Sequence, residues 1–315
     1  MIVAFHCLCL SAGIWNNFFH IKMVSTHRII ANFLNTFDLP FFFFVSGFLY
    51  AYLLIQKGKY KETGVFIINK IKRLVLPYFI WGGVMLIIYP NLCTPIAFIN
   101  GIAHLWFLPT LFCIFLVFAF FHPIKTSLYT DIILVLLTSL ALKWIHLNTD
   151  LPLFLRQACK YTPYFVIGFV YEKHIVKTIL NEFKAWIIGI GLIITVCLVE
   201  GLIIIKFNNS YISFLIYIIL ISMVTILLLE FYRKCSPSIP KHIEKAVNNL
   251  DKNSMGIYIL HQILIWGLLS VNCIYTYFQI HILFAPLLLF LIIFPLSWII
   301  AEIINKSVIS KILFG

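Results

Sequence analysis

A histidine close to the chain start is the first residue with the chemistry for catalysis. His6 stands about five residues into an apolar run, roughly 7–8 Å from the start of a membrane helix. An ionisable residue at this depth is a candidate functional group. Imidazole titrates near neutral pH and can take a proton from a hydroxyl. The alternative is a histidine that bonds a neighbouring helix or lies near the interface.

Three basic residues precede the third apolar run of the chain. Lys70, Lys72 and Arg73 lead into Leu74–Tyr78, at a predicted depth similar to that of His6. Cations beside a membrane-embedded base suit a donor that carries phosphate, such as a nucleotide or coenzyme A. The alternative is charge that sets the topology and contacts phospholipid head groups.

The second apolar run, Phe37–Tyr50, carries polar residues at its head and in its middle. Asp38 and Pro40 open the run, and Ser46 and Gly47 follow within it. A carboxylate at the centre of a membrane helix costs roughly 2.5–3.5 kcal/mol. We therefore expect Asp38 at the outer end of the span, where it reaches water or a substrate. The small size of Ser46 and Gly47 permits close helix packing.

Two further segments pair histidine with an aromatic residue. His104 and Trp106 open the fourth run, where Trp106 could belong to an aromatic belt at the membrane interface. The alternative is that Trp106, beside His104, forms a wall for a sugar ring. Tyr258 and His261 are three residues apart and share a helix face. This pair is either a polar bridge between helices or part of a site.

The elements that position these residues are predicted to be membrane helices. Of the 315 residues, 62% are hydrophobic and 11% are charged, whereas a soluble domain has about 25% charged residues. The apolar runs are mostly ~17–22 residues long and do not alternate, so they are helices rather than barrel strands. We predict an all-α bundle of about ten spans, roughly 1–19, 37–56, 71–90, 104–122, 128–146, 161–172, 185–205, 211–230, 254–272 and 282–304.

The basic residues set the predicted orientation. With the N-terminus inside, the cytoplasmic segments hold 17 of the 23 Lys and Arg residues, so both termini are predicted to be cytoplasmic. This bias explains much of the net charge of +12 and argues against nucleic-acid binding. Four candidate residues fall in the cytoplasmic half: His6, Arg73, Tyr258 and His261. Three fall in the outer half: Asp38, His104 and Trp106.

The eight cysteines are scattered, and most lie inside apolar runs. None forms a Cys-x-x-Cys or zinc-type spacing, so we predict no metal site and interpret these residues as small packing groups. No polar stretch is long enough for a soluble domain. We therefore expect one polytopic domain over residues 1–315, whose first helix is shortened at its cytoplasmic end.

Together these segments resemble the membrane acyltransferase-3 family, whose ten-helix members O-acylate surface sugars and related acceptors. Each matching motif is weak alone, but five in family order on a ten-span frame are fairly specific. The matching segments are Phe37–Tyr50, Lys72–Tyr78, Leu105–Leu108, Tyr164–Gly168 and Ile257–His261.

The resemblance implies an O-acyltransferase of the bacterial cytoplasmic membrane. Its donor would be acyl-coenzyme A, usually acetyl-coenzyme A, arriving from the cytoplasm, with no tightly bound cofactor. Its acceptor would be a saccharide of exopolysaccharide, capsule or O-antigen type. His6 would be the essential group, deprotonating the acceptor or relaying the acyl group, and Arg73 would lie near the donor with Lys70 and Lys72. The candidate substrate-binding residues are Asp38, Ser46, His104, Trp106, Tyr258 and His261.

The chain departs from the family pattern at one position, and other interpretations remain open. The family carries a basic residue upstream of the helix-1 histidine, at a position that here would precede Met1. Either the start is placed too late, or the chain is a truncated or diverged copy that is inactive. The rival function is export of polysaccharide or lipid-linked intermediates without catalysis. Acetyl and succinyl remain alternative acyl groups.

Overall fold

The computed structural model describes residues 1–15, 19–60, 62–91, 93–120, 126–174, 184–205, 210–235 and 240–315. All regular secondary structure in these ranges is helical, which confirms the predicted all-α class. The α-helices are α1 (Ile2–Ala12), α2 (Ser25–Ala51), α3 (Thr63–Lys70), α4 (Leu76–Ile88), α5 (Ala97–Asn100), α6 (Phe107–Phe120), α7 (Leu128–Asn148), α8 (Leu153–His174), α10 (Ala185–Ile205), α11 (Ser210–Cys235), α12 (Lys241–Leu269), α13 (Asn272–Ile280), α14 (Ala285–Asn305) and α15 (Ser310–Leu313). Two π-helical turns, η1 (Tyr52–Gln56) and η2 (Ile71–Val75), and one 3-10 turn, η3 (Ala103–Trp106), continue them.

Several of these helices have the length and hydropathy of membrane spans. Among the described residues, six segments qualify: Ser25–Gln56, Thr63–Ile88, Ala103–Phe120, Leu128–Asn148, Tyr211–Cys235 and Ala285–Asn305. The pair α12 and α13, bent by 90° at a short break, has the composition of a further span that is broken or of a re-entrant loop. Each of the ten predicted spans overlaps a helix, although the first overlaps only the 11 residues of α1. Residues 16–18 of the first span and 121–122 of the fourth lie outside the described residues. Ten crossings and cytoplasmic termini stay predictions.

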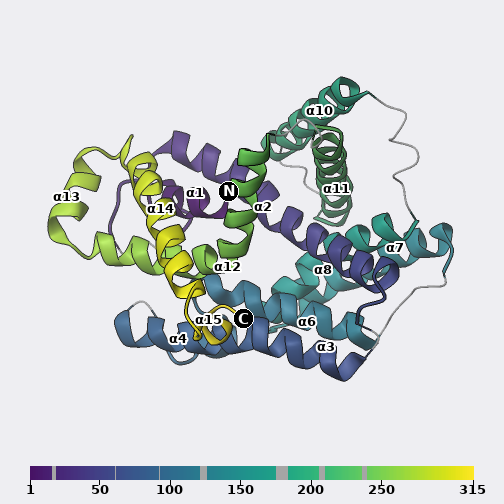
Figure 1. Cartoon of the computed structure of the whole chain (residues 1–315). Coiled ribbons are helices and arrows are strands. Elements are labelled where there is room, and N and C mark those ends of the chain that lie inside the picture. The colour runs from purple at the N-terminus through teal and green to yellow at the C-terminus, as the bar shows by residue number, and fades with distance from the viewer. Residues whose placement is uncertain are drawn as a thin grey trace. The chain divides into compact units, whose positions relative to one another are not determined.

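The chain forms two compact units. Unit 1 comprises residues 1–38, 71–109 and 241–315, and unit 2 comprises residues 39–70 and 110–240. In unit 1, α1, α12 and α14 lie side by side (Figure 1). Phe5, Cys9 and Ala12 of α1 pack with Ala31 of α2 in the apolar core that holds the start of the chain.

Unit 2 contains a close helix crossing at two glycines. A Cβ atom at Gly47 of α2 would clash with the carbonyl group of Phe165 in α8, and one at Gly168 would clash with the carbonyl group of Phe44. The two backbones therefore approach each other where no side chain intervenes, as the small residues predict. Elsewhere in unit 2, α8 packs against α7 and α11, and α10 packs against α11.

Three helices begin earlier than the apolar runs predict. Helix α2 begins at Ser25 rather than near residue 37, and its early buried positions, His27 and Ala31, lie on one face. Such an amphipathic start is too polar to be recognised by hydropathy. Helix α12 likewise begins at Lys241 rather than near residue 254, and α8 begins at Leu153, so Pro163 lies inside it rather than at its boundary.

Candidate functional site

Two buried histidines from distant parts of the chain form the centre of the candidate site. Nδ1 of His6 in α1 lies 2.6 Å from Nε2 of His261 in α12. The two rings stack with centroids 4.8 Å apart and planes 25° apart. Both side chains are buried in unit 1. His6 is thus bonded to a second helix and lies in a histidine pair that the spacing in the sequence does not reveal.

The hydrogen bonds of this pair fix which nitrogen carries each proton. Nδ1 of His261 lies 3.0 Å from the carbonyl oxygen of Ile257, which can only accept. In neutral rings, Nε2 of His261 is then the acceptor, and Nδ1 of His6 is the donor. The lone pair of His6 therefore lies on Nε2, which makes no hydrogen bond to any described residue. That atom can take a proton or attack a carbonyl carbon.

A third histidine contacts both members of the pair. The ring centroid of His104 lies 4.9 Å from that of His261 and 6.0 Å from that of His6. Its Nε2 lies 3.2 Å from the carbonyl oxygen of Ile259. His104 and His6, which were predicted to lie in opposite halves of the membrane, are thus neighbours in one cluster. The half of the membrane that holds each of them stays a prediction.

A strained turn presents His104 to this cluster. Ala103 has a φ of 43°, and Gly101 has a φ of 101°. A non-glycine residue in this region costs about 1–3 kcal/mol and persists where the surroundings impose it. Tyr258 holds the turn from the other side, because its hydroxyl donates to the backbone carbonyl of His104. Tyr258 is thus both a bridge between elements and a neighbour of the histidines.

Each ring of the histidine cluster has at least one nitrogen within hydrogen-bond distance of a partner. Nδ1 of His6 lies against Nε2 of His261, and Nε2 of His104 lies against a backbone carbonyl oxygen. Across the described ranges, no group of three His, Cys, Asp or Glu residues is placed to hold a metal ion. Within the cluster, His261 fixes the orientation of the His6 ring through their hydrogen bond.

The comparisons with known proteins decide the family. The family model for the acyltransferase-3 domain, described as an acyltransferase domain, matches residues 1–304. The chain belongs to the acyltransferase-3 family. The match covers both compact units and confirms the resemblance drawn from the five motifs. No curated protein and no solved structure matches the chain.

Asp38 of this acyltransferase lies far from the helix end at which it was predicted. It is near the middle of the segment Ser25–Gln56 and only 6% exposed, so it is buried inside a longer helix than the apolar run predicts. Its position at the outer end of the membrane span, next to water or a substrate, stays a prediction.

The remaining candidate residues of the acyltransferase are distributed over both units. Ser46 is half-buried in unit 2, next to the glycine crossing. Trp106 is half-buried in unit 1 and packs over Gly101, where a Cβ atom would meet its side chain. Lys72 and Arg73 are exposed on the π-helical turn η2. Lys70 has another partner, because its ammonium nitrogen lies 3.6 Å from the ring centroid of Phe115.

Two residues of the site were not predicted from the sequence: Trp15 and Gln262. The ring of Trp15 lies 5.0 Å from that of His6, just after the left-handed turn at Gly13 that ends α1. Gln262 follows His261 and is buried in α12. Trp15 looks like any aromatic residue of an apolar run, and Gln262 looks like an exposed amide. A polar residue at a buried helix position is the signal that would have identified Gln262.

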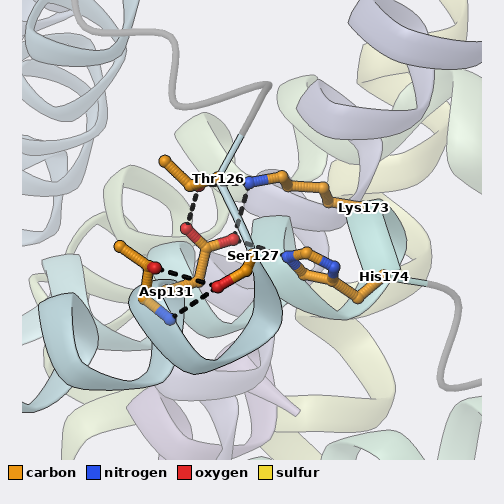
Figure 2. A network of polar contacts seen from close by, with 6 residues as sticks. Thr126, Ser127, Asp131, Lys173 and His174 are labelled. Atoms are coloured by element: carbon orange, nitrogen blue, oxygen red, sulfur yellow. Dashed lines mark hydrogen bonds and ion pairs between the residues drawn. The ribbon is translucent and has the colours of Figure 1, made fainter.

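A second polar network of the acyltransferase lies in unit 2, outside the predicted site. Asp131 at the start of α7 accepts hydrogen bonds from Thr126, Lys173 and His174, and Figure 2 shows its carboxylate between these side chains. The distances from Oδ2 to Nζ of Lys173 and to Nε2 of His174 are both 2.6 Å. The side chains of Lys173 and Asp131 are 5% and 3% exposed. This buried ion-pair network joins the end of α8 to the start of α7.

Removing one partner of this buried ion pair is expected to destabilise the protein strongly. Asp131→Leu leaves Lys173 buried without its carboxylate, and we expect a loss of about 3–5 kcal/mol, measured as a lower melting temperature. The double variant Asp131→Leu with Lys173→Met is expected to recover most of the loss. Equal losses in the single and double variants would show that the ion pair is not the cause. Glu302→Gln is the control, because its pair with Lys306 is exposed and worth about 0–1 kcal/mol.

Proposed function

We propose that this acyltransferase moves an acyl group, acetyl by preference, from acyl-coenzyme A to a hydroxyl of a cell-surface saccharide. The observation that carries the proposal is the lone pair on Nε2 of His6, oriented by His261 inside a buried site. Acyl transfer to a hydroxyl requires a group that accepts its proton, and a neutral imidazole with a fixed tautomer meets this need. The proposed location is the cytoplasmic membrane of a bacterium.

The proposed reaction needs one proton acceptor that also returns the proton. Nε2 of His6 takes the proton of the acceptor hydroxyl while the oxygen adds to the thioester carbonyl. The tetrahedral intermediate then collapses, the C–S bond breaks, and the sulfur leaves with the proton that His6 returns. His261 does not touch the reacting atoms in this scheme. It is a positioning residue that keeps the other proton of His6 on Nδ1.

Removing the hydrogen bond between His261 and Nδ1 of His6 is expected to lower the catalytic rate. In His261→Leu, Nδ1 of His6 loses its acceptor, and we expect kcat to fall by about tenfold or more with little change in KM, because the tautomer is no longer fixed. His261→Gln is expected to retain more activity, since its side-chain oxygen can reach the position of Nε2. Initial rates of acetyl transfer measure both variants. Equal rates in the leucine and glutamine variants would contradict the positioning role.

The donor would be bound by cations on the π-helical turn. Lys72 and Arg73 are exposed there, available to the phosphates of coenzyme A. Lys70 is omitted from this role because its ammonium group lies over an aromatic ring. Entry of the donor from the cytoplasm agrees with the excess of Lys and Arg in the segments predicted to be cytoplasmic.

The proposal is tested in cells by the ester content of the surface glycan. Cells that carry the gene are expected to show acyl esters on the glycan, and cells that lack it are expected to lose them while still exporting the glycan. Loss of the glycan itself, with unchanged ester content of what remains, would favour the exporter. Unchanged glycan and unchanged esters would favour an inactive relative.

A further inference from the structure

Gln262 is a buried amide whose polar atoms have no partner. Its side chain is 1% exposed, and neither Oε1 nor Nε2 makes a hydrogen bond within the described part of the chain. Buried polar groups in native proteins are nearly always bonded, so each exception needs an explanation. The amide lies directly after His261, the residue that orients the proposed base.

A third unpartnered atom belongs to His104. Nδ1 of His104 is buried and makes no hydrogen bond within the described ranges, and because Nε2 faces a carbonyl oxygen, Nδ1 carries the lone pair. The His104 ring packs against the rings of Tyr258 and His261. Residues 258 and 262 are four apart, so Gln262 shares a helix face with Tyr258, whose ring packs against His104.

The unpartnered atoms indicate which hydrogen-bonding groups a ligand must offer them. They comprise two acceptors, Nδ1 of His104 and Oε1 of Gln262, and one donor group, Nε2 of Gln262. A phosphate or a thioester carbonyl offers only hydrogen-bond acceptors. It would leave Nδ1 of His104 and Oε1 of Gln262 without a donor. Neighbouring hydroxyls satisfy the set, because each hydroxyl both donates and accepts.

We propose that Gln262 and His104 form a hydroxyl-binding subsite for the acyl acceptor. It holds hydroxyls next to the one that His6 deprotonates, so the enzyme selects polyols over simple alcohols. This proposal rests on the proposed acyl transfer, because that reaction supplies the hydroxyl-bearing substrate. A site built to bond a hydroxyl discriminates strongly against an analogue that lacks it, since its buried polar groups are then left bare.

The test compares two alcohols that differ by one hydroxyl. The probes are trans-1,2-cyclohexanediol and cyclohexanol, with acetyl-coenzyme A as donor. The wild-type protein is expected to favour the diol in kcat/KM by about tenfold or more, and Gln262→Leu is expected to reduce this preference to about twofold, the ratio of hydroxyl counts. A preference that Gln262→Leu leaves unchanged would overturn the proposal.

Thermal stability provides the second measurement. Leucine removes two unpartnered polar atoms, so Gln262→Leu is expected to raise the melting temperature by about 2 °C or more. Ser222→Ala is the matched control, because Ser222 is a buried, unpartnered hydroxyl in unit 2. It is expected to be at least as stable as the wild type and to keep the diol preference. Gln262→Met serves the same purpose if the leucine variant does not fold.

The outcomes separate this proposal from the proposed function. The proposed function fails if the surface glycan keeps its esters in cells that lack the gene, whatever the alcohol assay shows. If the wild-type protein acetylates neither alcohol, the subsite is tested by binding instead. Protection of the wild type from thermal unfolding by the diol but not by cyclohexanol, lost in Gln262→Leu, then supports the subsite. Equal protection by both alcohols would overturn it.

Discussion

His6→Asn is expected to reduce acyl transfer by about 10²–10⁴-fold, the contribution of a positioned general base. Asparagine places an amide N–H near the position of Nδ1, so the hydrogen bond to His261 can persist. It offers no lone pair at the position of Nε2, where the acceptor proton would go. The variant therefore removes the base and retains the contact that joins α1 to α12.

The measurement is the initial rate at which labelled acetyl groups pass from acetyl-coenzyme A to the acceptor. The melting temperature, recorded on the same preparation, shows whether the fold survives. His242→Asn is the matched control, because His242 is an exposed histidine on α12, the helix that carries His261. Its rate should equal that of the wild type. A His6→Asn protein with a wild-type rate would remove His6 from the mechanism.

The second large effect is expected at the glycine crossing of unit 2. Gly168→Ala forces a methyl group into the carbonyl group of Phe44, and Gly47→Ala does the same against Phe165. Overpacking a close contact costs about 1–3 kcal/mol, and more where the obstacle is backbone rather than a flexible side chain. We expect each single variant to melt at a clearly lower temperature and the double variant not to yield folded protein.

The control for this prediction comes from glycines in open space. A Cβ atom at Gly64 or Gly83 would meet nothing within 4 Å. Alanine there is expected to be neutral or to stabilise the helix by up to about 1 kcal/mol, because alanine has the higher helix propensity. Size-exclusion profiles and melting curves in detergent measure all four variants. Similar losses at Gly64 and Gly168 would show that helix contact is not the cause.

The hydropathy of the sequence predicts where the helices lie but not where they begin. Each of the ten apolar runs overlaps a helix, because a long apolar run is stable in lipid only with its backbone bonded internally. Helices α2 and α12 begin earlier, at Ser25 and Lys241, because polar residues continue the helix on an exposed face. Hydropathy records the apolar part alone.

The same limit explains what could be predicted of the site. Residue type identified His6, His104 and His261, since an ionisable group in an apolar run is costly and therefore informative. The topology count assigned His104 and His6 to opposite halves of the membrane, and only the structure shows that His104 contacts both members of the pair. The tautomer of His6 depends on a hydrogen bond across a large sequence separation, which no local pattern contains.

The most direct measurement of the central claim is thiol release by the purified protein in lipid nanodiscs. With acetyl-coenzyme A and a saccharide acceptor, the wild-type protein is predicted to release one thiol for each ester formed, only when the acceptor is present. His6→Asn is predicted to release thiol about 10²-fold more slowly or not at all. Absence of both thiol and ester with the wild-type protein, or equal release by the two proteins, would contradict an acyltransferase that works through His6.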